Sequence, residues 1–136
     1  MPADAEAIRL VNEFIAAINA RDLKRLAQLM TKDHSFVDAT GAVHGGRETM
    51  TASWKVYFEK FPKYKIEVET TLSKGGVVAA FGWVSGSAPA DARTGRSRSW
   101  RVPAAWRAVV KGTAIAEWQV CCDLEPMLRS TGSQRW

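Results

Sequence analysis

The chain has 136 residues, of which 46% are hydrophobic and 24% are charged, and its formal net charge is +5. These values fit one globular domain that is long enough to bury a core. We expect no membrane-spanning helix, because no apolar run approaches the ~20 residues that cross a bilayer. The acidic start of the chain does not resemble a secretory signal. Neighbouring cysteines such as Cys121 and Cys122 bridge each other only with strain. We therefore expect a cytoplasmic protein without a disulfide framework.

The first half of the chain carries the apolar spacing of helices. Residues 3–20 predict an amphipathic helix, and Asp22 suits the N-cap of a second helix over residues 23–30. Residues 35–37 predict a short strand that ends at Asp38. A third helix is predicted over residues 46–61. Its apolar stripe consists of Met50, Trp54, Tyr57, Phe58 and Phe61.

After Pro62 the apolar spacing changes to strand alternation. Residues 64–72 and 77–87 predict one hairpin, and residues 97–110 and 113–124 predict another. Helices followed by long antiparallel strands predict an α+β fold, with the helices on one face of a curved sheet. We expect a single domain over residues 1–129 and a flexible tail over residues 130–136.

Residues 93–107 hold five arginines and two tryptophans. In a nucleic-acid-binding protein, such arginines would contact phosphates and such tryptophans would stack on bases. The alternative is a turn and a strand whose exposed face carries arginine. Because the rest of the chain is not basic, we expect no nucleic-acid partner.

Three stretches resemble the NTF2-like superfamily, in its SnoaL-like and ketosteroid-isomerase-like branches. They are VNEFIAAINARDL (residues 11–23), LMTKDHSFVDATGAVHGGR (29–47) and WRAVVKGTAIAEWQVCCDLEP (106–126). The resemblance implies a cone, in which three N-terminal helices pack on a strongly curved, mainly antiparallel sheet that encloses an apolar pocket. It also implies a homodimer. This scaffold carries many functions, so the fold does not assign one.

Asp38 matches the proton-shuttling aspartate of the isomerase-like members. A carboxyl beside Phe36 and the aromatics of the third helix would be desolvated, which would raise its pKa and suit a base. The alternative is an Asx-turn, in which the side chain accepts backbone hydrogen bonds from Thr40 or Gly41. His44 can titrate near neutral pH, although a histidine in a glycine-rich loop is often simply solvated.

The partners that such an aspartate has in the isomerase-like members are missing here. Those members hold the developing oxyanion with a tyrosine and a protonated aspartic acid, where this chain has Phe14 and either Ala104 or Ala105. SnoaL-like cyclases need only an acid–base carboxyl beside an already acidic carbonyl compound. Asp38 or Asp123, with His44, would supply that carboxyl.

Asp123 also matches one aspartate of epoxide-hydrolase-like members, but Phe81 and Trp83 stand where the charged pair of that site should be. Strand alternation places Asp123 on one face with Gln119 and Cys121. We expect that face to line the pocket, and the opposite face, with Trp118 and Val120, to be buried in a dimer. The alternative for Asp123 is a strand-end carboxylate that pairs with arginine near the rim.

Large aromatic side chains are core residues by default, but so many of them would also wall a pocket for a flat or apolar ligand. No spacing of possible ligands indicates a metal, and we expect no cofactor. The expected ligand-binding residues are Phe14, Phe36, Trp54, Tyr57, Phe58, Phe81, Trp83, Trp106, Gln119 and Cys121.

The sequence thus predicts a small SnoaL-like pocket protein with two alternative functions. The first is a cofactor-independent isomerase or cyclase that acts on a small apolar carbonyl compound, with Asp38 as the base and His44 and Asp123 beside it. The second is a domain without catalysis, which binds a small hydrophobic ligand or serves as an accessory, dimerising unit. Whether the chain is an enzyme stays open at the level of sequence.

Overall fold

The computed structural model describes residues 3–88 and 98–131. The helices are α1 (Asp4–Ala20), α2 (Leu23–Leu29), α3 (Arg47–Lys60) and α4 (Glu125–Thr131). The strands are β1 (Met30–Val37), β2 (Val43–Gly45), β3 (Lys65–Lys74), β4 (Val77–Ala88), β5 (Arg98–Lys111) and β6 (Ala114–Cys122). None of the helices in the described ranges is long and apolar enough to span a membrane.

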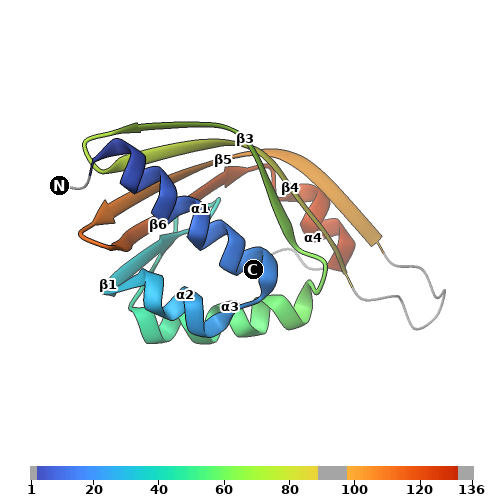
Figure 1. The fold of residues 1–136 in the computed structure, drawn as a ribbon. Helices are drawn as coiled ribbons and strands as arrows, with labels where there is room; N and C mark the ends of the chain where they lie inside the picture. Colours follow the sequence, from blue (N-terminus) through green and yellow to red (C-terminus); the bar gives the residue numbers. More distant parts are fainter. Residues whose placement is uncertain (1–2, 89–97, 132–136) are drawn as a thin grey trace.

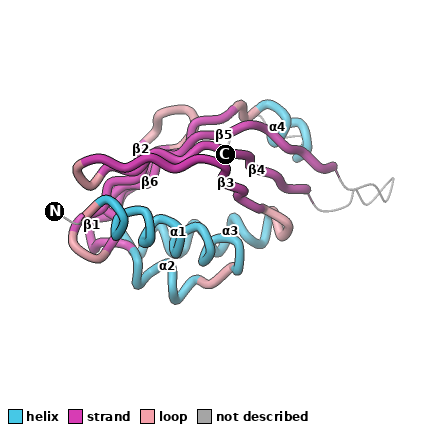
Figure 2. Tube along the Cα trace, turned by 45° about the horizontal axis from the view of Figure 1, so that its top comes forward, coloured by secondary structure: helices cyan, strands magenta, loops and turns pink. Residues whose placement is uncertain are grey.

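The six strands form one sheet in the order β2-β1-β6-β5-β4-β3. β1 and β6 run parallel, and every other neighbouring pair is antiparallel. The sheet curves over α1, α2 and α3, which lie together on its concave side (Figure 1). These three helices form one layer and the strands a second, and α4 lies beside the strands (Figure 2). The predicted α+β fold, with three N-terminal helices on a curved and mainly antiparallel sheet, is confirmed.

The helices begin and end where local signals place them. α1 buries Leu10, Phe14 and Ile18 along one side, as its apolar spacing predicts. The Asp22 side chain caps α2 by accepting a hydrogen bond from the Arg25 backbone N at 3.0 Å. These local signals account for the start of α2 and for the buried side of α1.

The bend of the sheet depends on a close approach of β3 to β4. The pairing of these strands changes register between Val68 and Thr70, and such a bulge bends a strand. A Cβ atom on Gly82 would lie 1.9 Å from the carbonyl oxygen of Glu67. Because any side chain at this position would collide with the neighbouring backbone, the bend requires glycine.

The two faces of the sheet differ in exposure. On the concave face, side chains such as Val78, Trp106 and Trp118 are buried against the helices and form the core. On the convex face, Leu72 and Phe81 are 61% and 46% exposed. The core therefore lies on the concave side alone.

Two elements were absent from the sequence-based prediction. The strand β2 is only three residues long and forms by pairing with β1, so it leaves little local signal. The helix α4 includes Ser130, whose hydroxyl donates to the Met127 carbonyl at 2.6 Å, although the predicted flexible tail begins at that residue. Residues 132–136 of that tail, and the first arginines of the basic segment, lie outside the described residues.

Candidate functional site

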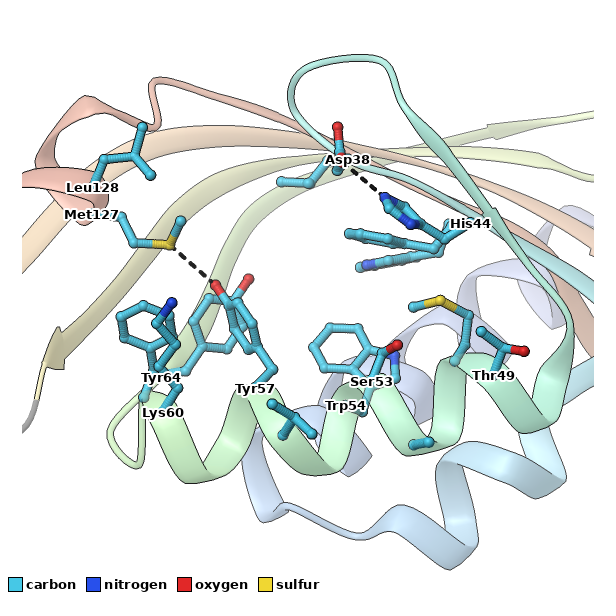
Figure 3. A pocket seen from close by; sticks show the side chains of 17 residues that line it. Asp38, His44, Thr49, Ser53, Trp54, Tyr57, Lys60, Tyr64, Met127 and Leu128 are labelled. Atoms are coloured by element: carbon cyan, nitrogen blue, oxygen red, sulfur yellow. Dashed lines mark hydrogen bonds and ion pairs between the residues drawn. The ribbon is translucent and has the colours of Figure 1, made fainter. Parts of the chain in front are cut away.

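A pocket of about 540 Å³ lies between the concave face of the sheet and α3 (Figure 3). The turn after β1, the strands β2 and β6 and the helix α4 line it on the side of the sheet, while α3 lines it from across the pocket. Most of its wall is apolar, and it includes Phe36, Trp54, Trp118 and Val120. Polar side chains are set into this wall at two places, the turn after β1 and the C-terminal end of α3.

The first place is the turn that follows β1, which holds Asp38. The Asp38 backbone N donates to the Ala42 carbonyl at 3.0 Å, and the Gly41 N donates to the Asp38 carbonyl at 2.9 Å. The carboxylate oxygen Oδ1 accepts hydrogen bonds from the Thr40 N at 2.8 Å and the Ala42 N at 3.1 Å, and from the Thr40 hydroxyl. Asp38 therefore forms an Asx-turn and also lines the pocket.

The second carboxylate oxygen of Asp38 contacts His44. The pairing of β2 with β1 places His44 opposite Phe36, and His44 Nε2 lies 2.8 Å from Asp38 Oδ2. Asp38 is 5% exposed and His44 is 46% exposed, so the pair connects the pocket wall to solvent. Across residues 3–88 and 98–131, no group of three or more His, Cys, Asp or Glu side chains is placed to hold a metal ion.

The environment of Asp38 sets its charge. Burial raises the pKa of this carboxyl, but the hydrogen bonds from His44, Thr40 and Ala42 together lower it by more, so the pKa lies below its ordinary value. The raised pKa expected from the sequence is therefore wrong, because donors replace the water that burial removes. At neutral pH Asp38 is an ionised carboxylate that can accept a proton.

The second polar place lies at the C-terminal end of α3. Tyr57 from α3 and Tyr64, just before β3, stand almost perpendicular, with ring centroids 4.9 Å apart. The Tyr57 hydroxyl donates to the sulfur of Met127 at 3.4 Å, as Figure 3 shows. Burial raises the pKa of both phenols, so both keep their protons. Lys60 lines the same end of the pocket and is exposed to solvent.

The predicted facing of the last strand is wrong. Trp118 and Val120 line the pocket and are 1% and 6% exposed. Because side chains alternate along a strand, Gln119 and Cys121 lie on the convex face, away from the pocket. The expectation that Trp118 and Val120 are buried in a dimer contact is wrong for the same reason.

Asp123 is also placed differently from the prediction. It lies after the end of β6, is exposed, and accepts a hydrogen bond from the Glu125 backbone N at 3.0 Å, where α4 begins. It is absent from the pocket wall. A carboxylate that meets the first N–H groups of a helix has a structural reason to be there, so we drop Asp123 from the site.

Three of the aromatic residues predicted to bind ligand lie in the core instead. Phe14, Phe58 and Trp106 are buried, and none of them lines the pocket. The ring of Phe14 packs 5.0 Å from that of Trp118, and Trp106 stacks on Trp118 at 6.4 Å. These rings pack against the side of Trp118 that faces the core. Apolar spacing in the sequence does not distinguish a core residue of this kind from a residue that lines the pocket.

Phe81 and Trp83 lie on the convex face of β4, so their predicted place in the pocket is wrong. Both have odd numbers in a strand whose even-numbered residues Val78, Ala80 and Val84 are buried on the concave side. Trp83 Nε1 donates to Glu69 at 3.0 Å.

Phe36, Trp54 and Tyr57 line the pocket as predicted, together with Asp38 and His44. Sequence reasoning missed Lys60, Tyr64 and the residues of α4. The spacing of Tyr57, Lys60, Phe61 and Tyr64 continues the stripe of α3 past Pro62, and this signal could have extended the predicted wall to Tyr64.

Residues 11–118 match the family model of the SnoaL-like domain. Among solved structures, the chain is similar to a candidate polyketide cyclase from Xanthomonas campestris, with a TM-score of 0.82 and 14% identity over 93% of this chain and 97% of that one. It is similar to a candidate SnoaL-like polyketide cyclase from Shewanella denitrificans, with a TM-score of 0.80 and 17% identity over 94% and 98% of the two chains.

A third similar structure is a protein from Catenulispora acidiphila with a ketosteroid-isomerase-like fold, solved in complex with trimethylamine. Its TM-score is 0.77, with 22% identity over 91% of this chain and 92% of that one. At these identities the likeness establishes the fold alone. No protein of curated function matches the sequence significantly.

Proposed function

Because this chain belongs to the SnoaL-like domain family, we propose that it binds a small apolar carbonyl compound and transfers a proton on it without a cofactor. The observation that carries the proposal is the pair Asp38–His44 in the wall of a largely apolar pocket. An ionised carboxylate in such surroundings is a suitable acceptor for a proton bound to carbon.

In the proposed reaction, Asp38 Oδ2 is the base, since Oδ1 already accepts hydrogen bonds from the turn. The C–H bond next to the substrate carbonyl breaks, its proton passes to Oδ2, and its electron pair moves onto the carbonyl oxygen as an enolate. The proton then returns to the same or another carbon, so nothing is oxidised or reduced. His44 holds Oδ2 in place through Nε2.

The low pKa of Asp38 restricts the substrate. A carboxylate of lowered pKa is a weak base, so the C–H bond must already be acidified by conjugation or by a second activating group. The side chains of Phe14 and of Ala104 or Ala105 are apolar and offer no donor to an enolate at the positions that correspond to the donors of isomerase-like members. A substrate that delocalises its own charge fits both observations.

Binding without turnover is the second candidate function. It is favoured by the Asx-turn, because hydrogen bonds from Thr40 and Ala42 give Asp38 a structural role that needs no catalysis. In that case the pocket holds a small hydrophobic ligand, and the pair with His44 serves only to shape one end of it.

The two candidates differ in hydrogen–deuterium exchange of an aromatic ketone with an activated C–H bond, for which β-tetralone is a suitable probe. We expect the protein to accelerate exchange at the benzylic carbon in D₂O, followed by NMR. Asp38→Asn should lower this acceleration about 100-fold, the usual share of a general base, while the turn is kept because the Asn oxygen still accepts. Unchanged exchange in Asp38→Asn rejects the base role, and binding without exchange in the wild type favours the second candidate.

We also propose a homodimer that forms through the convex face of the sheet. Leu72 and Phe81 are exposed there together with Val77. The register places Leu72 opposite Ala79 and therefore diagonal to both Val77 and Phe81. Such a cluster of exposed apolar side chains is typical of an interface. Phe81→Arg should produce monomers in sedimentation velocity, and a monomeric wild type contradicts the proposal.

The cytoplasmic location expected from the two free cysteines stays a prediction.

A further inference from the structure

We infer that the pocket recognises its ligand at two ends, and that the ligand is an apolar carbonyl compound with a carboxylate at the end opposite the reacting carbon. The reacting end is the pair Asp38–His44, so this inference rests on the proposed function. The recognising end consists of Tyr57, Lys60 and Tyr64, called the acid-binding end below.

The two ends lie at different points along α3, which lines the pocket from Thr49 to Lys60. Asp38 lies across the pocket from the middle of this helix (Figure 3). Thr49 lies near His44, whereas Lys60 lies beside Tyr64 at the far side of the pocket (Figure 3). Trp54 lies between them, in contact with the ring of Tyr57 at 5.9 Å. A ligand that reaches both ends must therefore be elongated, with an apolar and preferably flat middle.

The tyrosines of the acid-binding end are suited to an anionic acceptor. The Tyr57 hydroxyl donates to the Met127 sulfur, which is a weak acceptor, and Tyr57 and Tyr64 also hydrogen-bond to each other through their side chains. A carboxylate oxygen in that position would form a shorter and stronger charge-assisted hydrogen bond. Both phenols are neutral donors, because burial raises their pKa, so they bring no negative charge that would repel a carboxylate.

The charges at the two ends fix the orientation of such a ligand. Lys60 is a cation whose Nζ lies 5.6 Å from the centre of the Phe61 ring, at the exposed rim of the pocket. Asp38 is an anion at the other end. A carboxylate is attracted by Lys60 and repelled by Asp38, so the opposite end of the ligand is presented to the base. A neutral molecule of the same shape lacks this preference.

The test compares two probes that differ only in charge: a β-tetralone with a carboxyl group on its aromatic ring, and the methyl ester of that acid. Their Kd values follow from quenching of tryptophan fluorescence, since Trp54 and Trp118 line the pocket. We expect the wild type to bind the acid about tenfold more tightly than the ester. Tyr64→Phe, which keeps the ring, should weaken binding of the acid by about tenfold.

A matched pair of variants isolates the lysine. Lys60→Met should remove most of the preference for the acid. Lys63→Met is the control, because Lys63 is also exposed and lies three residues further on, but is absent from the wall of this pocket. It should keep the preference of the wild type.

Equal Kd values for acid and ester in the wild type overturn the inference, as does an equal loss of preference in Lys60→Met and Lys63→Met. Exchange at the benzylic carbon, measured on the same two probes, reports separately on the proposed function. A preference for the acid without accelerated exchange supports the acid-binding end and rejects proton transfer by Asp38. Accelerated exchange with equal Kd values supports proton transfer and overturns the acid-binding end.

Discussion

The concave and convex faces of the sheet both carry large apolar side chains, but the concave face packs against the helices and the convex face is exposed. Along β6, Trp118 and Val120 face the pocket while Gln119 and Cys121 face outward. The convex face nevertheless holds Phe81, an aromatic residue that would suit a pocket wall. Alternation therefore sorts residues into two groups, but the contacts with the helices decide which group is inside.

The sharpest test of this comparison replaces neighbouring residues of β6. Trp118→Ala should destabilise the fold by about 3–5 kcal/mol, because it opens a cavity in the core. Gln119→Ala should change the free energy of unfolding by less than about 0.5 kcal/mol, as is usual for substitutions outside the core. Urea denaturation measures both. Similar losses in the two variants would show that the faces are assigned wrongly.

A smaller effect is expected where the sheet bends. Gly82→Ala should cost about 2–3 kcal/mol, because its methyl group would meet the backbone of Glu67 and force β3 away from β4. Gly45→Ala is the control, since a Cβ atom there has nothing within 4 Å. If both variants unfold at the same urea concentration as the wild type, the concave shape does not depend on this contact.

The smallest effect comes from His34, a fully buried residue of β1 on the concave face. Its ring Nδ1 lies 2.7 Å from the Ile115 carbonyl, and burial lowers its pKa below 6.5. In the unfolded chain the ring takes up a proton as the pH falls through 6.5, while in the folded chain it resists. Stability should therefore fall below about pH 6.5, by at most about 1.4 kcal/mol per pH unit.

The His34 contribution can be isolated by substitution. His34→Leu should flatten the pH dependence of urea denaturation between pH 7 and pH 5, whatever its effect on stability at pH 7. An unchanged pH dependence in His34→Leu would contradict this role.

Most of the fold could be predicted from the sequence because its signals are local. The helical spacing of residues 3–20, the Asp22 cap and the glycine turns of both hairpins each need only neighbouring residues. The short strand β2 could not be predicted in this way, because its three residues are held by pairing with β1.

The candidate site could be predicted only in part. Asp38 and His44 lie on the two sides of one turn, so the sequence already brings them together. Tyr64 reaches the pocket only after Pro62 turns the chain, and Trp118 only through the facing of β6. The sign of the Asp38 pKa shift depends on donors from Thr40 and His44, and their geometry is set by the folded turn.

The most direct test of the central claim, that Asp38 is the base, is the pH dependence of β-tetralone exchange catalysed by the wild type. Because the pKa of Asp38 lies below its ordinary value, the carboxylate stays ionised as the pH falls. We predict a catalysed rate, corrected for exchange without protein, that is constant from pH 8 to pH 5 and falls only below about pH 4. A fall between pH 7 and pH 6 would identify a group other than the Asp38 carboxylate as the base and contradict the account.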